Sequence, residues 1–196
     1  MQSSLETRAP GAPRARVSAV RRREPTGVER VLGADELIVS KTDTSGRITY
    51  VNRTFLRISG FTEAELLGTP HSIVRHPAMP RGTFRLMWDT IRSGREFFAY
   101  VLNLAKTGDH YWVFAHVTPT FDPGGEVVGY HSNRRAVTRE AIDRIEPLYR
   151  RLVDLEATHA DPGEAADASL EALSRELAAA GTTYDRFVFS LAEERT

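Results

Sequence analysis

The chain has 196 residues, 26 basic and 26 acidic side chains, and no cysteine. This length accommodates one domain with a real hydrophobic core plus extensions. Balanced charge argues against binding to nucleic acid or membranes by bulk electrostatic attraction. The lack of cysteine excludes disulfides, thiolate metal sites and cysteine nucleophiles. No apolar run approaches a bilayer span and no signal peptide is recognisable, so we expect a cytoplasmic protein without a membrane span.

Residues 1–30 are predicted to form a disordered, arginine-rich tail. Residues 1–24 hold six arginines against two glutamates, and prolines and glycines recur from Pro10 to Gly27. The run Arg21-Arg22-Arg23 could contact phosphates, but a charge block of this kind is more often a solvated tail. A small regulator that binds DNA through this tail is therefore a minor alternative.

After residue 35 the pattern gives two strands, several short helices and three further strands. The predicted strands cover residues 37–39, 47–51, 96–104, 111–120 and 127–134. One predicted helix begins after the capping residue Asn52. Two further helices are predicted over residues 63–67 and 83–93. The last of these carries Phe84, Met87, Trp88 and Ile91 on one face.

Two motifs on either side of that helix carry most of the functional information. Val74-Arg75-His76-Pro77 places a guanidinium beside an imidazole in a loop that Pro77 restricts. Gly108-Asp109-His110-Tyr111-Trp112 opens a strand with two rings that point to opposite faces. Together with Trp88, these residues suit a pocket for a flat, anionic cofactor.

Each of these residues also has a structural interpretation. Trp88 can equally be part of the core, Asn52 is a natural helix cap, and Arg75 with His76 can simply solvate a loop. Asp109-His110 has no matched serine nucleophile, so we do not expect an enzyme. His71 and His76 have no third ligand nearby, so we expect no metal site.

The motifs resemble the PAS domain family, and more closely the flavin-binding PAS domains of bacterial aerotaxis receptors. The resemblance covers about residues 37–150. Because these receptors are bacterial, it implies a bacterial protein. Its most specific segments are Asn52-Arg53-Thr54-Phe55, Pro70 to Pro77, Met87-Trp88, Lys106 to Trp112 and Glu146-Pro147-Leu148-Tyr149. It implies an α+β fold, namely a PAS fold with a five-stranded antiparallel sheet and short helices on one face. The PAS domain would occupy residues 31–137, and a helical extension residues 138–196.

By this resemblance the cofactor is FAD. The matching positions are Asn52, Arg75, His76, Trp88, Asn103 and Tyr111. Two positions depart from that branch, since Ala78 stands where Asp is usual and Phe97 where Trp is usual. Haem is an alternative cofactor, and its candidate axial ligands are His71, His76, His110, His116 and His131. Without cysteine, the flavin–thiol adduct of light-sensing PAS relatives cannot form, so a flavin here would report redox state or occupancy.

The carboxy-terminal extension carries apolar stripes that include Leu173 and Leu177. These helices either fold back onto the sheet or pair with a second copy or partner, and we predict a homodimer through them. The overall expectation is a stand-alone PAS sensor that reads redox or energy state through flavin. It would signal by binding an unidentified protein in motility, chemotaxis or a related pathway. A cofactor-free PAS adaptor is the alternative.

Overall fold

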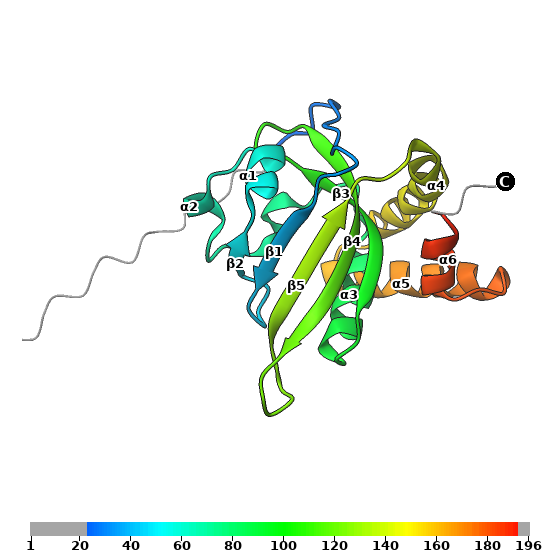
Figure 1. Cartoon of the computed structure of the whole chain (residues 1–196). Helices are drawn as coiled ribbons and strands as arrows, with labels where there is room; N and C mark the ends of the chain where they lie inside the picture. Colours follow the sequence, from blue (N-terminus) through cyan, green and yellow to red (C-terminus); the bar gives the residue numbers. More distant parts are fainter. Residues whose placement is uncertain (1–22, 192–196) are drawn as a thin grey trace, which may run out of the picture.

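A computed structural model describes residues 23–191, which form a five-stranded antiparallel sheet with helices packed against it (Figure 1). The strand order is β2-β1-β5-β4-β3. The strands are β1 Ile38–Thr42, β2 Ile48–Val51, β3 Phe97–Leu104, β4 His110–Phe121 and β5 Val127–Arg135. The predicted α+β PAS fold is confirmed, and every predicted strand is present. Within the described range, no helix has the length and apolar composition that a membrane crossing requires.

The helices fall into two groups along the chain. Those between β2 and β3 are α1 Arg53–Ser59, α2 Glu63–Leu66, the 3₁₀ helix η1 His71–Val74, and α3 Arg81–Arg92. Those after β5 are α4 Arg139–Glu156, α5 Pro162–Ala179 and α6 Tyr184–Ser190. In Figure 1 the second group lies together beside β3 and α3, whereas α1 and α2 lie at the β2 end of the sheet.

Side chains alternate between the two faces of the long strands. Both faces are largely buried along β3 and along the first half of β4. Val101 and Asn103 of β3 face η1 and α3, and we call this side the inner face. Tyr100 and Leu102 of β3 and Trp112 of β4 join an apolar cluster with the carboxy-terminal helices on the outer face. The ring of Trp112 stacks on Tyr149 of α4 with a centroid distance of 6.2 Å.

The stripes of the carboxy-terminal helices are buried within the chain. Leu173 and Leu177 of α5 belong to the same cluster as Trp112, and Tyr149 Oη donates a hydrogen bond to the Tyr100 carbonyl at 2.8 Å. That hydrogen bond covers part of the free edge of β3, which would otherwise be open to another strand. The arrangement is the fold-back alternative. A homodimer stays a prediction, and these two leucines are not available to form it.

A tight contact at Gly82 joins α3 to α5. A Cβ atom at Gly82 would lie 2.2 Å from Ser169 Oγ and 2.6 Å from the Leu170 nitrogen. The Gly82 N–H donates to Ser169 Oγ at 2.9 Å and to Glu156 Oε1 at 3.1 Å. Glu156, at the end of α4, also accepts from the Arg81 N–H, so a carboxylate caps the positive end of α3. Helices α3, α4 and α5 therefore meet at this point.

We expect Gly82→Ala to lower the free energy of unfolding by about 1–3 kcal/mol, the usual cost of forcing atoms into a packed contact. The sign of the change in unfolding free energy is informative, because alanine is otherwise a better helix former than glycine by about 1 kcal/mol. Urea unfolding followed by circular dichroism measures the change. The control is Gly124→Ala in the β4–β5 turn, where a new Cβ meets only the flexible Asp122 side chain, at 3.2 Å. Equal stability of the two variants would contradict the tight α3–α5 contact.

Candidate functional site: a cavity between the sheet and helix α3

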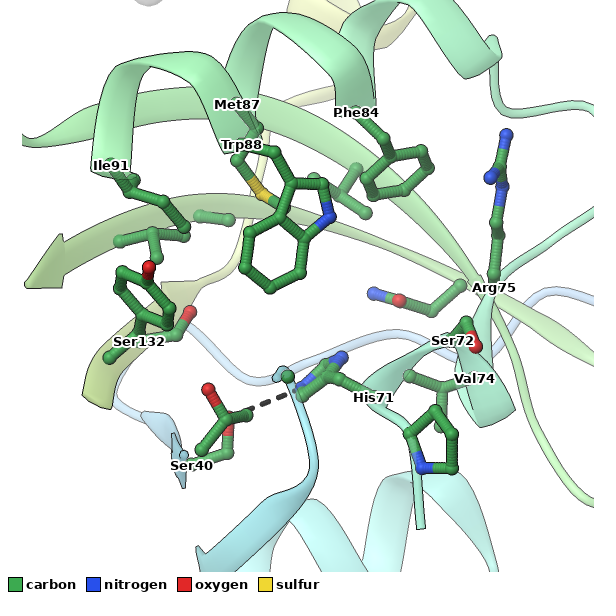
Figure 2. Close-up of a pocket in the computed structure, with 18 of the residues that line it drawn as sticks. Ser40, His71, Ser72, Val74, Arg75, Phe84, Met87, Trp88, Ile91 and Ser132 are labelled. Atoms are coloured by element: carbon green, nitrogen blue, oxygen red, sulfur yellow. Dashed lines mark hydrogen bonds between the residues drawn. The ribbon is translucent and has the colours of Figure 1, made fainter. Parts of the chain in front are cut away.

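A cavity of about 270 Å³ lies between the inner face of the sheet and the helices η1 and α3. This volume is close to the lower end of the range for small-molecule sites, roughly 300–1,000 Å³. Figure 2 shows Phe84, Met87 and Trp88 extending from α3 toward the cavity, with Ser40 and His71 on the opposite side. The apolar face predicted for residues 83–93 is therefore a cavity wall.

Trp88 forms the aromatic part of that wall. Its indole meets the Tyr130 ring edge-on, with centroids 5.5 Å apart, and the Arg92 guanidinium lies 5.0 Å from its centre. Gly46, in the turn between β1 and β2, has φ +79°, and a Cβ there would lie 2.9 Å from the indole. This turn needs glycine for both reasons, and it holds the indole at the cavity.

A hydrogen-bonded group of Ser40, His71 and Arg134 forms the polar part of the wall. Arg134 Nη2 donates to Ser40 Oγ at 2.9 Å and to His71 Nε2 at 2.6 Å. Because guanidinium has no lone pair to offer, His71 Nε2 must be unprotonated. Burial, and secondarily the neighbouring Arg134 charge, lower the pKa of His71 to about 3. The imidazole is therefore neutral at physiological pH.

Two polar atoms of the cavity lining are buried without a hydrogen-bond partner in the structure. They are Asn103 Nδ2 on β3 and Ser132 Oγ on β5, in residues that are 4% and 7% exposed. A buried polar atom without a partner costs roughly 1–3 kcal/mol, so native proteins rarely leave one. Both atoms belong to residues of the same cavity, which points to a ligand that supplies the missing partners.

Arg75 adds a second positive charge to the lining. Its Nη2 donates to the Met79 carbonyl at 3.0 Å, and its guanidinium lies 4.4 Å from the centre of the Phe84 ring. Burial, with a contribution from the nearby Arg81 charge, lowers the pKa of Arg75 to about 10. The group therefore remains charged at neutral pH.

Of the six cofactor positions predicted by resemblance, three line the cavity and three do not. Arg75, Trp88 and Asn103 line it. Asn52 caps α1, with Oδ1 accepting from the Phe55 and Val39 N–H groups, and its amide donates to the Leu37 carbonyl. His76 Nδ1 accepts from the Ala78 N–H, and Tyr111 is buried in the apolar core beneath the cavity. The structure thus gives Asn52, His76 and Tyr111 roles in local structure and packing.

Neither of the two departures from the aerotaxis pattern is part of the cavity lining. Ala78 is exposed in the turn before α3, and Phe97 is buried in a stack with Tyr184 of α6, with centroids 5.2 Å apart. Neither departure therefore changes a residue that lines the cavity. Among the five candidate haem ligands, only His71 lines the cavity.

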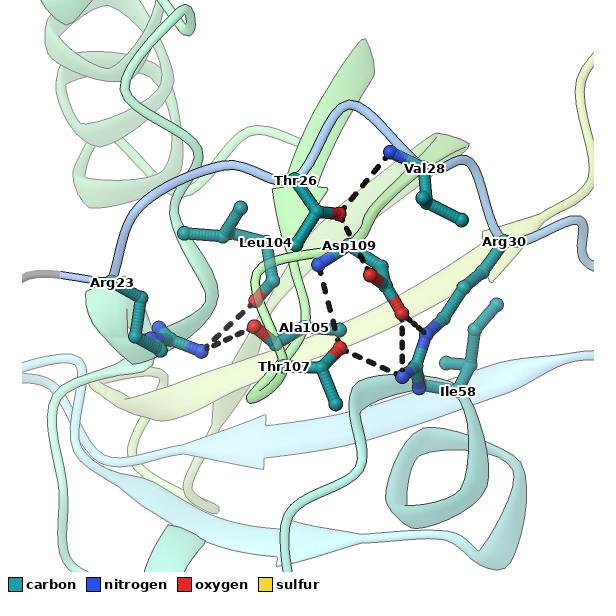
Figure 3. Close-up of polar contacts among 9 residues, drawn as sticks. All are labelled: Arg23, Thr26, Val28, Arg30, Ile58, Leu104, Ala105, Thr107 and Asp109. Carbon is teal, nitrogen blue, oxygen red and sulfur yellow. Dashed lines mark hydrogen bonds and ion pairs between the residues drawn. The ribbon is translucent and has the colours of Figure 1, made fainter.

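The motif around Asp109 holds the amino-terminal segment rather than a ligand (Figure 3). Asp109 accepts from Thr26 Oγ1 at 2.8 Å and from Arg30 Nε at 2.9 Å. At Gly108, with φ +96°, a Cβ would lie 2.3 Å from the Glu24 carbonyl oxygen, so glycine lets the segment pass. Arg23 donates to the carbonyls of Leu104, Ala105 and Ile73.

Residues 23–30 were predicted as tail, and this part of the prediction is wrong. The misleading signal was composition, because Arg23 and Arg30 appear as exposed charge in the sequence but are used for these contacts. Arg23 is thereby withdrawn from the run of arginines proposed to contact phosphates. The rest of that run and of the predicted tail, residues 1–22, lies outside the described residues.

Sequence reasoning missed Ser40, Ser132 and Arg134, and noted His71 only as a metal or haem ligand. A signal was present, since Tyr130, Ser132 and Arg134 alternate along β5 and must share one face. What the sequence alone did not give was the pairing that sets Ser40 opposite Ser132 on the neighbouring strand.

Comparison with known proteins identifies the class of this domain. Residues 38–132 match the PAS fold family. Residues 38–132 therefore form a PAS domain, and the resemblance drawn from the motifs is confirmed over these residues.

Within that family, the aerotaxis receptor of Escherichia coli strain K12 is 44% identical over 121 residues, 62% of this chain and 24% of the receptor. A nitrogen fixation regulatory protein of Klebsiella pneumoniae is 30% identical over 100 residues, 51% of this chain and 20% of that protein. The chain thus spans a quarter or less of these relatives. The light-state structure of the blue-light photoreceptor Aureochrome1 LOV matches with a TM-score of 0.50 and 21% identity, covering 62% of this chain and 91% of that one. This likeness confirms the fold.

The depressed pKa of His71 predicts a specific pH dependence of stability. The unfolded chain, with a histidine pKa near 6.5, binds the proton more readily than the folded protein, so stability falls as pH falls below about 7. Between pH 7 and pH 5, linkage gives a loss of about 2 kcal/mol from this residue. In His71→Gln the amide oxygen still accepts from Arg134, and we expect the loss over this interval to be smaller by that amount. Urea unfolding at both pH values measures this difference. Equal losses in the two proteins would contradict a His71 that is neutral in the folded protein.

Proposed function

We propose that this PAS domain is a signalling sensor that binds a flavin in the cavity between α3 and the sheet and reports its redox state or occupancy. The observation that carries the proposal is the pair of unpartnered buried atoms, Asn103 Nδ2 and Ser132 Oγ, in a cavity that also carries aromatic side chains and two positive charges. The similarity to an aerotaxis receptor supports the same assignment.

The lining fits the isoalloxazine ring in chemical terms. The ring is flat and apolar on its faces, which suits Trp88, Phe84 and Val101. One edge of the ring carries carbonyl and ring-nitrogen acceptors, which suits the Asn103 amide and the Ser132 hydroxyl. When bound, the flavin would supply reversible electron uptake, while the protein supplies binding and the electrostatic environment. FAD is the expected form, and FMN would use the same ring contacts.

Haem fits less well. His71 Nε2 already accepts from Arg134, so coordination of iron would require this contact to break. His76, His110, His116 and His131 do not belong to the cavity lining. Adduct photochemistry is excluded because the chain contains no cysteine.

The output is proposed to be a contact with another protein rather than catalysis. Helix α3 carries Trp88 toward the cavity and, through Gly82, contacts α5, so a shift of this helix would reach the carboxy-terminal helices. Strand β5 carries Ser132 and Arg134 and leads, after Thr138 as helix cap, into α4. Both routes end on α4–α6. A homodimer and a heterologous signalling partner are both compatible with this output, and motility or chemotaxis is the proposed setting.

We expect purified protein, or protein incubated with FAD, to absorb near 450 nm (about the flavin maximum). Trp88→Ala should weaken flavin binding at least about fivefold, because a lost ring–ring contact costs about 1 kcal/mol beyond the loss of buried area. Equilibrium titration monitored by flavin fluorescence measures the affinity. The control is Trp112→Phe, which changes the other tryptophan, on the outer face against Tyr149.

Three results would separate the alternatives. Colourless protein that takes up neither FAD nor FMN would overturn the proposal in favour of a cofactor-free adaptor. A Soret band in place of the flavin spectrum would favour haem. Equal loss of affinity in both tryptophan variants would move the binding site away from α3.

A further inference from the structure

Arg134 places a positive charge in the cavity wall, and no carboxylate of the described residues 23–191 pairs with it. The residue is 6% exposed, near the carboxyl end of β5. Its guanidinium donates from Nη2 to Ser40 Oγ and His71 Nε2, and lies 5.3 Å from the centre of the Phe55 ring.

The groups around Arg134 are neutral at physiological pH. The pKa of His71 is about 3, and burial raises the pKa of the Tyr111 phenol, so imidazole and phenol are both uncharged. Burial lowers the pKa of Arg134 itself to about 10, and the guanidinium therefore stays protonated. This part of the wall carries one net positive charge.

A buried ion without a counter-charge destabilises a folded protein, and removing it is often neutral or stabilising. Perturbed charged groups of this kind are concentrated at functional sites, where a ligand interacts with the charge. The cavity gives an independent indication of a ligand, since Ser132 Oγ, on the same strand and face, has no partner. The expected ligand group is a planar ring with acceptor atoms that carries, or can acquire, negative charge.

We propose that Arg134 determines which charge state of the bound ring the cavity prefers, and that it favours the anionic one. The inference rests on the proposed flavin function. The oxidised flavin ring is neutral, whereas uptake of two electrons and one proton from an external reductant leaves it anionic at pH 8. A fixed guanidinium then binds the reduced ring more tightly than the oxidised ring. By thermodynamic linkage, the tighter binding of the reduced ring raises the reduction potential of the bound flavin.

The test compares three variants in the ligand-free protein reconstituted with FAD. Arg134→Met removes the charge and keeps the length of the side chain, Arg134→Lys keeps the charge, and Arg135→Met changes the exposed neighbour on the opposite face. Dissociation constants are measured at pH 8 for oxidised FAD and, under anaerobic conditions, for dithionite-reduced FAD. The reported quantity is the ratio of the two constants.

We expect the wild-type protein to bind reduced FAD more tightly, and Arg134→Met to reduce that preference by about tenfold or more, the scale of a hydrogen bond to a charged group. A tenfold change corresponds to about 30 mV in a two-electron potential. Arg134→Lys should retain most of the preference and Arg135→Met all of it. The ligand-free Arg134→Met protein should be at least as stable to urea as wild type, whereas a purely structural arginine would give lower stability with an unchanged ratio.

The possible failures are distinguishable. If wild type binds FAD and Arg134→Met leaves the ratio unchanged, the role of Arg134 is overturned while the proposed function stands. If wild type binds FAD in neither redox state, the proposed function fails, and this inference fails with it. If Arg134→Met does not fold, Arg134→Gln serves in its place, because it removes the charge and can still donate to Ser40.

Discussion

Burial of β3 and of the first half of β4 on both faces is the constraint on which the rest of this structure depends. In β3 and β4, successive side chains must satisfy different environments, with Val101 and Asn103 facing the cavity and Tyr100 and Leu102 facing the carboxy-terminal helices. A shift of one residue in the register would exchange the two sets. The cavity and the docking surface for α4 are therefore specified by the same strands, and neither can change without affecting the other.

The features that could be predicted from the sequence are those with a local signal. The strands were found because period-two alternation and turn residues are local signals, and the apolar face of α3 was found because its spacing is helical. What covers the carboxy-terminal stripes is not predictable in the same way, since an apolar stripe indicates burial without identifying the surface that covers it. In the structure, Leu173 and Leu177 join the cluster that contains Trp112, about sixty residues earlier in the chain.

The candidate site was only partly predictable because its residues are brought together by contacts between distant parts of the chain. Arg75, Trp88 and Asn103 were assigned by resemblance, and they do line the cavity. Ser40, His71 and Arg134 were not grouped, because 31 residues separate the first two and 63 the last two, and each residue type is unremarkable alone. Conversely, Asn52 and Asp109 are distinctive in sequence because backbone groups and the amino-terminal segment need them. Motif residues can thus be distinctive for folding as well as for binding.

The positive charges of the site determine which charge state of a ligand the cavity binds more tightly. Arg75 and Arg134 are both held by neutral partners, the Met79 carbonyl for one and Ser40 with His71 for the other. A ligand that gains negative charge is attracted to both, and Arg134 stands four residues before the Thr138 cap that starts α4. A single charged hydrogen bond changes a two-state equilibrium by roughly ten- to a hundredfold, less than the ten-thousandfold needed to invert it fully. A sensor built on this wall would therefore give a graded output, with the carboxy-terminal helices shifting in population as the charge of the ligand changes.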